Sequence, residues 1–206
     1  MRNSRQRVWA GGTADRSGLA VIWLVGSAAL IIAALSLVLE TGWLQLCRSE
    51  VRVIAESAAL AGARSWGLAA TNDAAARTAA KTAAAQIVTG STVEGSNAEL
   101  LALAAALAAN NNALATNNNA VCPAALPAVN TVVLLGDFEA ATCVLAAGTA
   151  PVPASRRACL VQFSLSLTSP FTSASRTVRA RAVAVWDPTV TPNRSRLVSL
   201  SAVTCP

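Results

Sequence analysis

The sequence predicts an α+β fold: an N-terminal transmembrane helix continues into a helical region, and an antiparallel β-sheet follows. Three observations support this prediction. Residues 17–39 form an apolar run without a charge. Residues 40–109 are rich in alanine and lack proline. After residue 129, apolar and polar residues alternate with the period of two that half-buried strands show.

The first two segments are a basic tail, residues 1–16, and the apolar run, residues 17–39. The run is long enough to cross a bilayer, which takes about 20 apolar residues in a helix. The positive charge of the tail predicts that the N-terminus lies in the cytoplasm and the bulk of the chain lies outside it. The basic residues of the tail are Arg2, Arg5, Arg7 and Arg16.

A cleaved secretory signal is the alternative interpretation of this run. Such signals have an apolar region of about 7–15 residues and a cleavage site with small residues. Here the run is longer, and it leads into Val38-Leu-Glu-Thr-Gly-Trp43, which is a poor cleavage site. The pattern therefore favours an uncleaved anchor.

Residues 40–109 are predicted to form the helical region that emerges from the membrane. No helix breaker separates the apolar run from Ala63, so we expect one long helix. Its small residues include Ala55, Ala58, Ala59 and Gly62. They form a stripe that lets two backbones approach closely, which predicts packing against another helix. The alternative is that the alanines reflect helix propensity alone.

This region resembles the N-terminal region of TadG-like and TadE-like proteins of the tight-adherence (Flp, type IVc) pilus system. That family typically has Arg-Gly, a span, Asp-x-Gly-Arg, then Ala-Asp-Ala-Ala-Ala-Leu-Ala-Gly-Ala. Here Arg16 and Gly18 precede the span, and Ala-Glu-Ser-Ala-Ala-Leu-Ala-Gly-Ala ends at Ala63. Glu40 and Glu56 take the acidic positions of the family motif, and a tryptophan replaces the usual arginine.

The resemblance implies a non-enzymatic, pseudopilin-like or assembly-platform protein of the bacterial inner membrane. It implies a pilin-like periplasmic domain, and partners among other pilus-assembly proteins, pilins or a second copy of the chain. Prepilin-like members of the family carry a glutamate five residues after the processing glycine. Here that position is Trp23, counted from Gly18. This departure favours the uncleaved, anchored branch.

Two further helices and a loop are expected before the sheet. Thr71 or Asn72 can cap a helix that runs to about Val88. Ser96 and Glu99 form a capping box for a short helix from Leu100 to Ala109. Residues 110–128, which contain two asparagine triplets, are predicted to form a loop.

Five strands are expected in the β domain, residues 129–206. The first candidate is residues 131–135, and a turn at Gly136 and Asp137 would let residues 140–145 pair back. Residues 158–168 and 176–186 alternate most clearly. Residues 197–203 are the fifth candidate.

The five cysteines are Cys47, Cys122, Cys143, Cys159 and Cys205. The periplasm is oxidising, so disulfides are expected in a domain there. The preferred pairings are Cys143–Cys159, which would join neighbouring strands, and Cys122–Cys205, which would tie the C-terminus to the entrance of the sheet. Cys47 is left over, as a free thiol or as a link to a second copy.

No enzyme, cofactor, metal or nucleic-acid function is expected. The chain has no histidine and no tyrosine, so triads that use a histidine base are excluded. It has no phosphate-binding glycine loop, and its cysteines lack the close spacing of zinc ligands. Its net charge is +6, but its basic residues are not interleaved with aromatic residues as they are in nucleic-acid binders. The alternative function is a secreted or membrane-anchored periplasmic binding module unrelated to pili.

Overall fold

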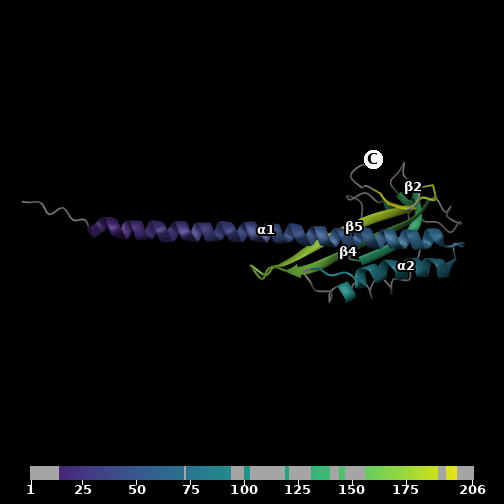
Figure 1. Ribbon diagram of the computed structural model, residues 1–206, viewed down its shortest axis with the longest axis horizontal. Helices are drawn as coiled ribbons and strands as arrows, with labels where there is room; N and C mark the ends of the chain where they lie inside the picture. The colour runs from purple at the N-terminus through teal and green to yellow at the C-terminus, as the bar shows by residue number, and fades with distance from the viewer. Residues whose placement is uncertain are drawn as a thin grey trace, which may run out of the picture. The chain divides into compact units, whose positions relative to one another are not determined.

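The computed structural model describes residues 14–71, 73–93, 100–102, 119–120, 131–139, 144–146, 156–189 and 194–198. The chain divides into two compact units, Met1–Trp43 and Leu44–Pro206. The first unit contains the apolar run. The second unit contains the sheet and the helical segments that pack on it (Figure 1).

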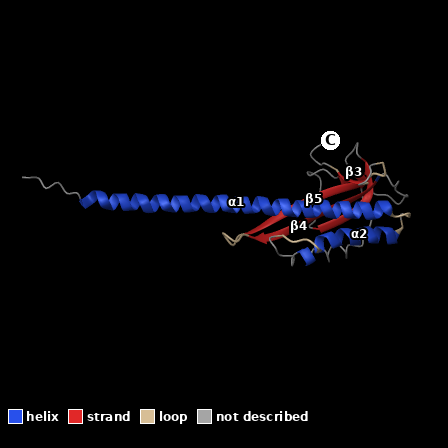
Figure 2. Cartoon of the chain, viewed as in Figure 1, coloured by secondary structure: helices blue, strands red, loops and turns tan. Residues whose placement is uncertain are grey.

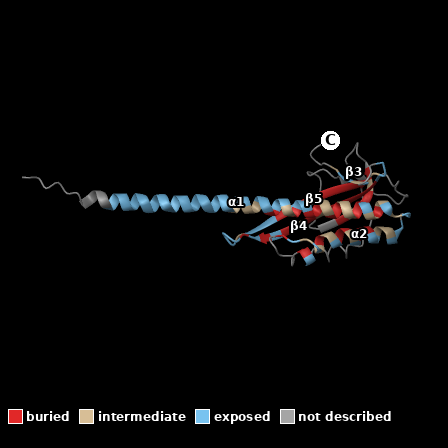
Figure 3. Ribbon diagram, in the orientation of Figure 1, coloured by how far each residue is buried: buried red, intermediate tan, exposed pale blue. Residues whose placement is uncertain are grey.

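Helix α1 (Ala14–Leu68) is one continuous helix of 55 residues. The prediction of a single helix from the apolar run to Ala63 is therefore confirmed. The helix contributes to both units and has a different character in each. Residues 18–39 are exposed, whereas buried residues recur from Cys47 to Trp66 (Figure 3).

Helix α2 (Ala74–Thr89) agrees with the helix predicted to end near Val88. Its N-cap is Asp73 rather than Thr71 or Asn72. The Asp73 carboxylate accepts hydrogen bonds from the Ala76 N–H (2.8 Å) and the Thr71 hydroxyl (3.0 Å). These bonds lower the pKa of Asp73, the backbone bond from Ala76 most. The capping box at Ser96 and Glu99 lies outside the described residues. Of the helix predicted after it, the structure describes residues 100–102, which are helical.

Among the described residues, the sheet has six strands in the order β1-β3-β2-β4-β5-β6, and all neighbours are antiparallel. Figure 2 shows the strands in red. The strands are β1 (Asn119–Ala120), β2 (Thr131–Glu139), β3 (Val144–Ala146), β4 (Arg157–Thr168), β5 (Ser175–Trp186) and β6 (Ser195–Leu197). The chain therefore has the α+β class that the sequence predicts. The two most clearly alternating segments are β4 and β5, and each begins one residue before its predicted start.

The predicted turn at Gly136 and Asp137 is wrong. Both residues lie inside β2, where Gly136 pairs with Ala158 and Asp137 pairs with Arg157 of β4. Pairing with a long neighbouring strand outweighs the local turn preference of glycine and aspartate. The return strand does form, but β3 pairs with the end of β2, from Asp137 to Glu139.

Two other strands differ from expectation. The predicted loop, residues 110–128, contains the short strand β1. The fifth candidate overlaps β6 only at Leu197, and residues 199–203 lie outside the described residues.

Apolar side chains are buried on both faces of the sheet. One face receives α1, because Gly62 lies against Cys159 of β4 and Gly67 lies against Trp186 of β5. The other face carries a separate cluster of buried residues. That cluster consists of Phe138, Ala158, Leu160, Val183 and Val185. Strand alternation thus places successive residues of β4 and β5 in two different cores.

Candidate membrane anchor and helix-packing site

In the described part of the first unit, the helix surface is apolar and its serine and threonine hydroxyls are hydrogen-bonded within the helix. Ser27, Ser36 and Thr41 each donate to a backbone carbonyl three or four residues earlier, at 2.9–3.0 Å. A polar group in lipid needs such an internal partner, because no water is present to replace it. Among the described residues, this helix is the one long and apolar enough to cross a membrane. Its composition and its exposed surface suit a membrane anchor.

The small-residue stripe of α1 is buried inside the second unit. Ala55, Ala58 and Ala59 are inaccessible to solvent, and Gly62 is also buried. An alanine side chain at Gly62 would lie 2.6 Å from the Cys159 sulfur and 3.5 Å from the Ala80 carbonyl oxygen of α2. The stripe therefore allows the backbone of α1 to approach both β4 and α2 of its own chain.

The stripe packs inside its own chain rather than against another protein. The sequence indicates close packing but does not identify the partner. In the structure, the partner is the sheet and helix of the same chain, so these four residues offer no surface to a helix of another protein. A contact between α1 and another helix needs a different face.

The C-terminal end of α1 is held by a buried arginine. Arg157 of β4 donates from Nη1 to the carbonyl oxygens of Trp66 (2.8 Å) and Ala69 (2.9 Å). Its guanidinium carbon also lies 5.8 Å from the centroid of the Trp66 ring. Carbonyls at a helix end lack intrahelical partners and carry partial negative charge, so a cation here satisfies and stabilises the end.

Cys159 of β4 and Lys81 of α2 are both buried. Burial raises the pKa of the Cys159 thiol to about 12. Burial also lowers the pKa of Lys81, and the nearby Cys159 opposes that shift. A thiol with a raised pKa is a poor nucleophile, because the thiolate is the reactive form. Cys159 therefore serves in packing against α1 rather than as a nucleophile.

The two acidic positions of the family motif have different surroundings. Glu56 accepts a hydrogen bond from Arg52 Nε at 2.7 Å, one helical turn away. Such exposed pairs contribute only about 0.3–0.5 kcal/mol. Glu40 lies on α1 directly after the apolar run and is half-buried. Asp137 of β2 forms an ion pair with Arg156, with 2.7 Å between Oδ1 and Nε.

The cysteine pairings remain predictions. Cys47 and Cys159 are buried and form no disulfide among the described residues, whereas Cys122, Cys143 and Cys205 lie outside them. The Cys143–Cys159 pairing was expected because the two cysteines would join neighbouring strands. The strands concerned, β3 and β4, are not neighbours, because β2 lies between them.

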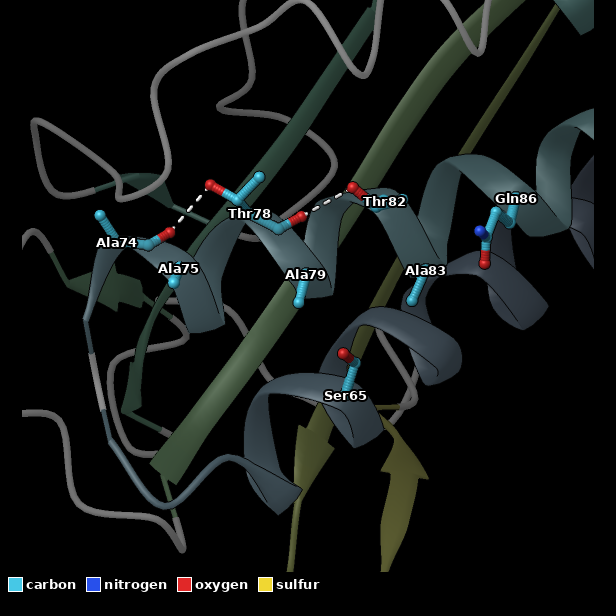
Figure 4. Close-up of a pocket in the computed structure, with 8 residues that line it drawn as sticks. All are labelled: Ser65, Ala74, Ala75, Thr78, Ala79, Thr82, Ala83 and Gln86. Carbon is cyan, nitrogen blue, oxygen red and sulfur yellow. Dashed lines mark hydrogen bonds between the residues drawn. The ribbon is translucent and has the colours of Figure 1, made fainter.

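An open groove runs along α2 beside the end of α1 (Figure 4). The hydroxyl of Thr78 donates to the Ala74 carbonyl (2.8 Å), and the hydroxyl of Thr82 donates to the Thr78 carbonyl (3.0 Å). Both hydroxyls thus donate to carbonyls of their own helix. No ionisable side chain is among the described residues that line the groove. Its lining residues are Ser65, Ala74, Ala75, Thr78, Ala79, Thr82, Ala83 and Gln86. The groove offers shape and van der Waals contact rather than a reactive group.

The contacts of Arg157, Gly67 and Trp186 were not predicted from the sequence. Gly67 lies against the Trp186 ring so closely that an added Cβ would be 2.1 Å from a ring carbon. A signal for this contact existed, since Trp66 and Gly67 closely follow the predicted helix, which ends at Ala63, and Trp186 ends one of the two clearest strands. Arg157 had no such signal, because arginine within a strand usually indicates a solvated position.

The comparison with protein families identifies the N-terminal segment. The family model described as "Putative Flp pilus-assembly TadE/G-like" matches residues 17–65. The match covers the apolar run and the small-residue stripe, and it confirms the resemblance found in the sequence. No curated protein and no solved structure matches the chain. Residues 17–65 of this chain are therefore similar to the TadE/G-like family of Flp pilus-assembly proteins.

Proposed function

We propose that this chain is a non-enzymatic, single-pass component of Flp/Tad pilus assembly, anchored in the inner membrane of a bacterium. Its N-terminus lies in the cytoplasm, and its sheet domain lies in the periplasm. The observation that carries the proposal is the family match to residues 17–65. The basic tail before the span supports the orientation.

The structure suggests how such a component meets its partners. Since the small-residue stripe is buried in its own domain, the partner helices meet the outer face of α1. Leu46 and Val53 lie on that face, seven residues apart, with 57% and 59% of their surface exposed. Two apolar side chains at this spacing lie on one side of a helix. The partners are pilins or other pilus-assembly proteins with an apolar helix.

The proposal is tested by pilus formation in cells. The chain is deleted and then restored as wild type, as the double variant Leu46→Gln and Val53→Gln, or as Leu68→Gln. Leu68 is the matched control, because it is an exposed leucine (61%) at the far end of the same helix. We expect pili from the wild type and from the control, counted by electron microscopy.

The double variant should make no pili although its folded domain remains in the membrane at the wild-type level. Normal piliation of the deletion strain would contradict the function itself. Normal piliation of the double variant alone would contradict the outer-face contact.

A further inference from the structure

The connection between β4 and β5 holds one aromatic side chain outward. Ser169 is 1% exposed, and its hydroxyl accepts from the N–H groups of Phe171 (3.2 Å) and Thr172 (3.3 Å). Its own N–H donates to the Ala174 carbonyl at 3.0 Å. Ser173 adopts the left-handed conformation, with φ of 56°. This turn has a defined shape, and it leaves Phe171 50% exposed.

Phe171 differs from every other described aromatic residue of the second unit. Trp66, Phe138, Phe163 and Trp186 are all buried. Exposure of a large aromatic side chain to water is unfavourable. The same side chain is stabilised at an interface that is apolar on one side and wet on the other.

The hairpin around Phe171 is cationic. The sequence from Ala158 to Trp186 contains no aspartate or glutamate. Arg176 and Arg179 of β5 are exposed close to the turn, while Arg181 donates to Gln162 of β4 at 3.0 Å. Phe171 and the exposed arginines together suit a surface that combines apolar groups with negative charge.

The hairpin lies at the end of the sheet opposite the C-terminus of α1 (Figure 2). β4 starts beside Trp66, passes Gly62 at Cys159 and then runs back along the domain. From Cys159 to the turn it covers about 30 Å at 3.3 Å per residue. Helix α1 covers the same distance in about 20 residues. Counted back from Gly62, this brings the turn level with the N-terminal end of the part of α1 that belongs to the second unit.

We propose that the β4–β5 hairpin docks on the surface of the bilayer that holds the anchor. Phe171 enters the interface between headgroups and acyl chains, and Arg176 and Arg179 contact anionic phosphate headgroups. The inference rests on the anchor in the proposed function. It adds a second membrane contact, made by the folded domain itself, which limits the orientations that the domain presents to its partners.

A photo-crosslinking amino acid, benzoylphenylalanine, tests the contact when it replaces Phe171 in the full chain. The protein is reconstituted into phosphatidylcholine vesicles with or without phosphatidylglycerol, irradiated, and analysed by intact mass for lipid adducts. The matched control carries the same amino acid at Leu197, which is also exposed (37%) but lies on β6. Retention of both proteins after an alkaline wash establishes the anchor separately.

We expect lipid adducts at position 171 and none at position 197, with a higher yield in the anionic vesicles. Arg179→Gln should lower the docked fraction in anionic vesicles about fivefold, since one arginine near an anionic surface has about this effect. Arg194→Gln, an exposed arginine before β6, should change nothing. The inference is overturned if position 171 yields no lipid adduct, if it crosslinks to protein instead, or if Arg194→Gln lowers the yield as much as Arg179→Gln. Protein that fails the alkaline wash refutes the anchor instead.

Discussion

Gly62→Ala tests whether the family stripe packs against the sheet of its own chain. The added methyl group would lie 2.6 Å from the Cys159 sulfur and 3.3 Å from the Cys159 Cβ. Overpacking of a buried contact costs about 1–3 kcal/mol. Alanine in place of glycine within a helix stabilises the helix by about 1 kcal/mol. The full chain should therefore lose about 1 kcal/mol of unfolding free energy.

The Cys159→Ala background should reverse the sign of this change. Without the sulfur, the nearest atom to the methyl group at position 62 is the Cβ of residue 159 at 3.3 Å. This contact needs a shift of only a few tenths of an ångström, so the gain in helix propensity dominates. Gly62→Ala should then stabilise the domain by up to about 1 kcal/mol. The two backgrounds differ by an interaction energy of about 1–3 kcal/mol, which is typical of residues in contact.

The assay is urea unfolding of the detergent-solubilised full chain, followed by the fluorescence of the buried Trp66 and Trp186. Gly42→Ala is the control on the same helix, because an added Cβ there meets no atom within 4 Å. An interaction energy below about 0.5 kcal/mol would refute the packing of Gly62 on Cys159.

Four further predictions use the same unfolding assay or thiol labelling. Gly67→Ala should cost about 2–3 kcal/mol, because the Trp186 ring cannot move away from the added methyl group without repacking; a neutral result would contradict this contact. Arg157→Gln should cost about 2–3 kcal/mol, since it removes two charged hydrogen bonds at the end of α1; an unchanged midpoint would show that water replaces them. Near neutral pH, Cys159 should resist maleimide in the folded chain and react in urea, because burial raises its pKa to about 12. Labelling in urea only after reduction would instead support the Cys143–Cys159 pairing. The stability of the wild type relative to Cys159→Ala should be constant below about pH 9 and fall as the pH rises toward 12, because the unfolded thiol ionises first; a rise would contradict the buried thiol.

The long, regular elements were predictable because their patterns repeat over many residues. β4 and β5 each alternate over 12 residues, which leaves little freedom in their boundaries. Helix α1 was predictable because no breaker interrupts it. In contrast, Gly136 and Asp137 have turn preferences that only the pairing of β2 with β4 overrides, and that pairing is not visible locally.

The candidate site was predictable in its residues but not in its partners. A small-residue stripe reports how closely a neighbour approaches, not which chain supplies that neighbour. Strand β4, which covers Gly62, begins nearly 100 residues later in the sequence, at Arg157. For the same reason the buried contact between Arg157 and the end of α1 had no local signal.

The most direct test of the account is the intact mass of the protein extracted from alkali-washed membranes of the cells that express it. We predict one species in which residues 17–39 remain joined to the sheet domain, because this segment is both the anchor and the start of the helix that forms the core. A species that begins after Glu40 would contradict the anchor. A species that begins at Leu19 would contradict the uncleaved branch and assign the chain to the processed, prepilin-like members of the family.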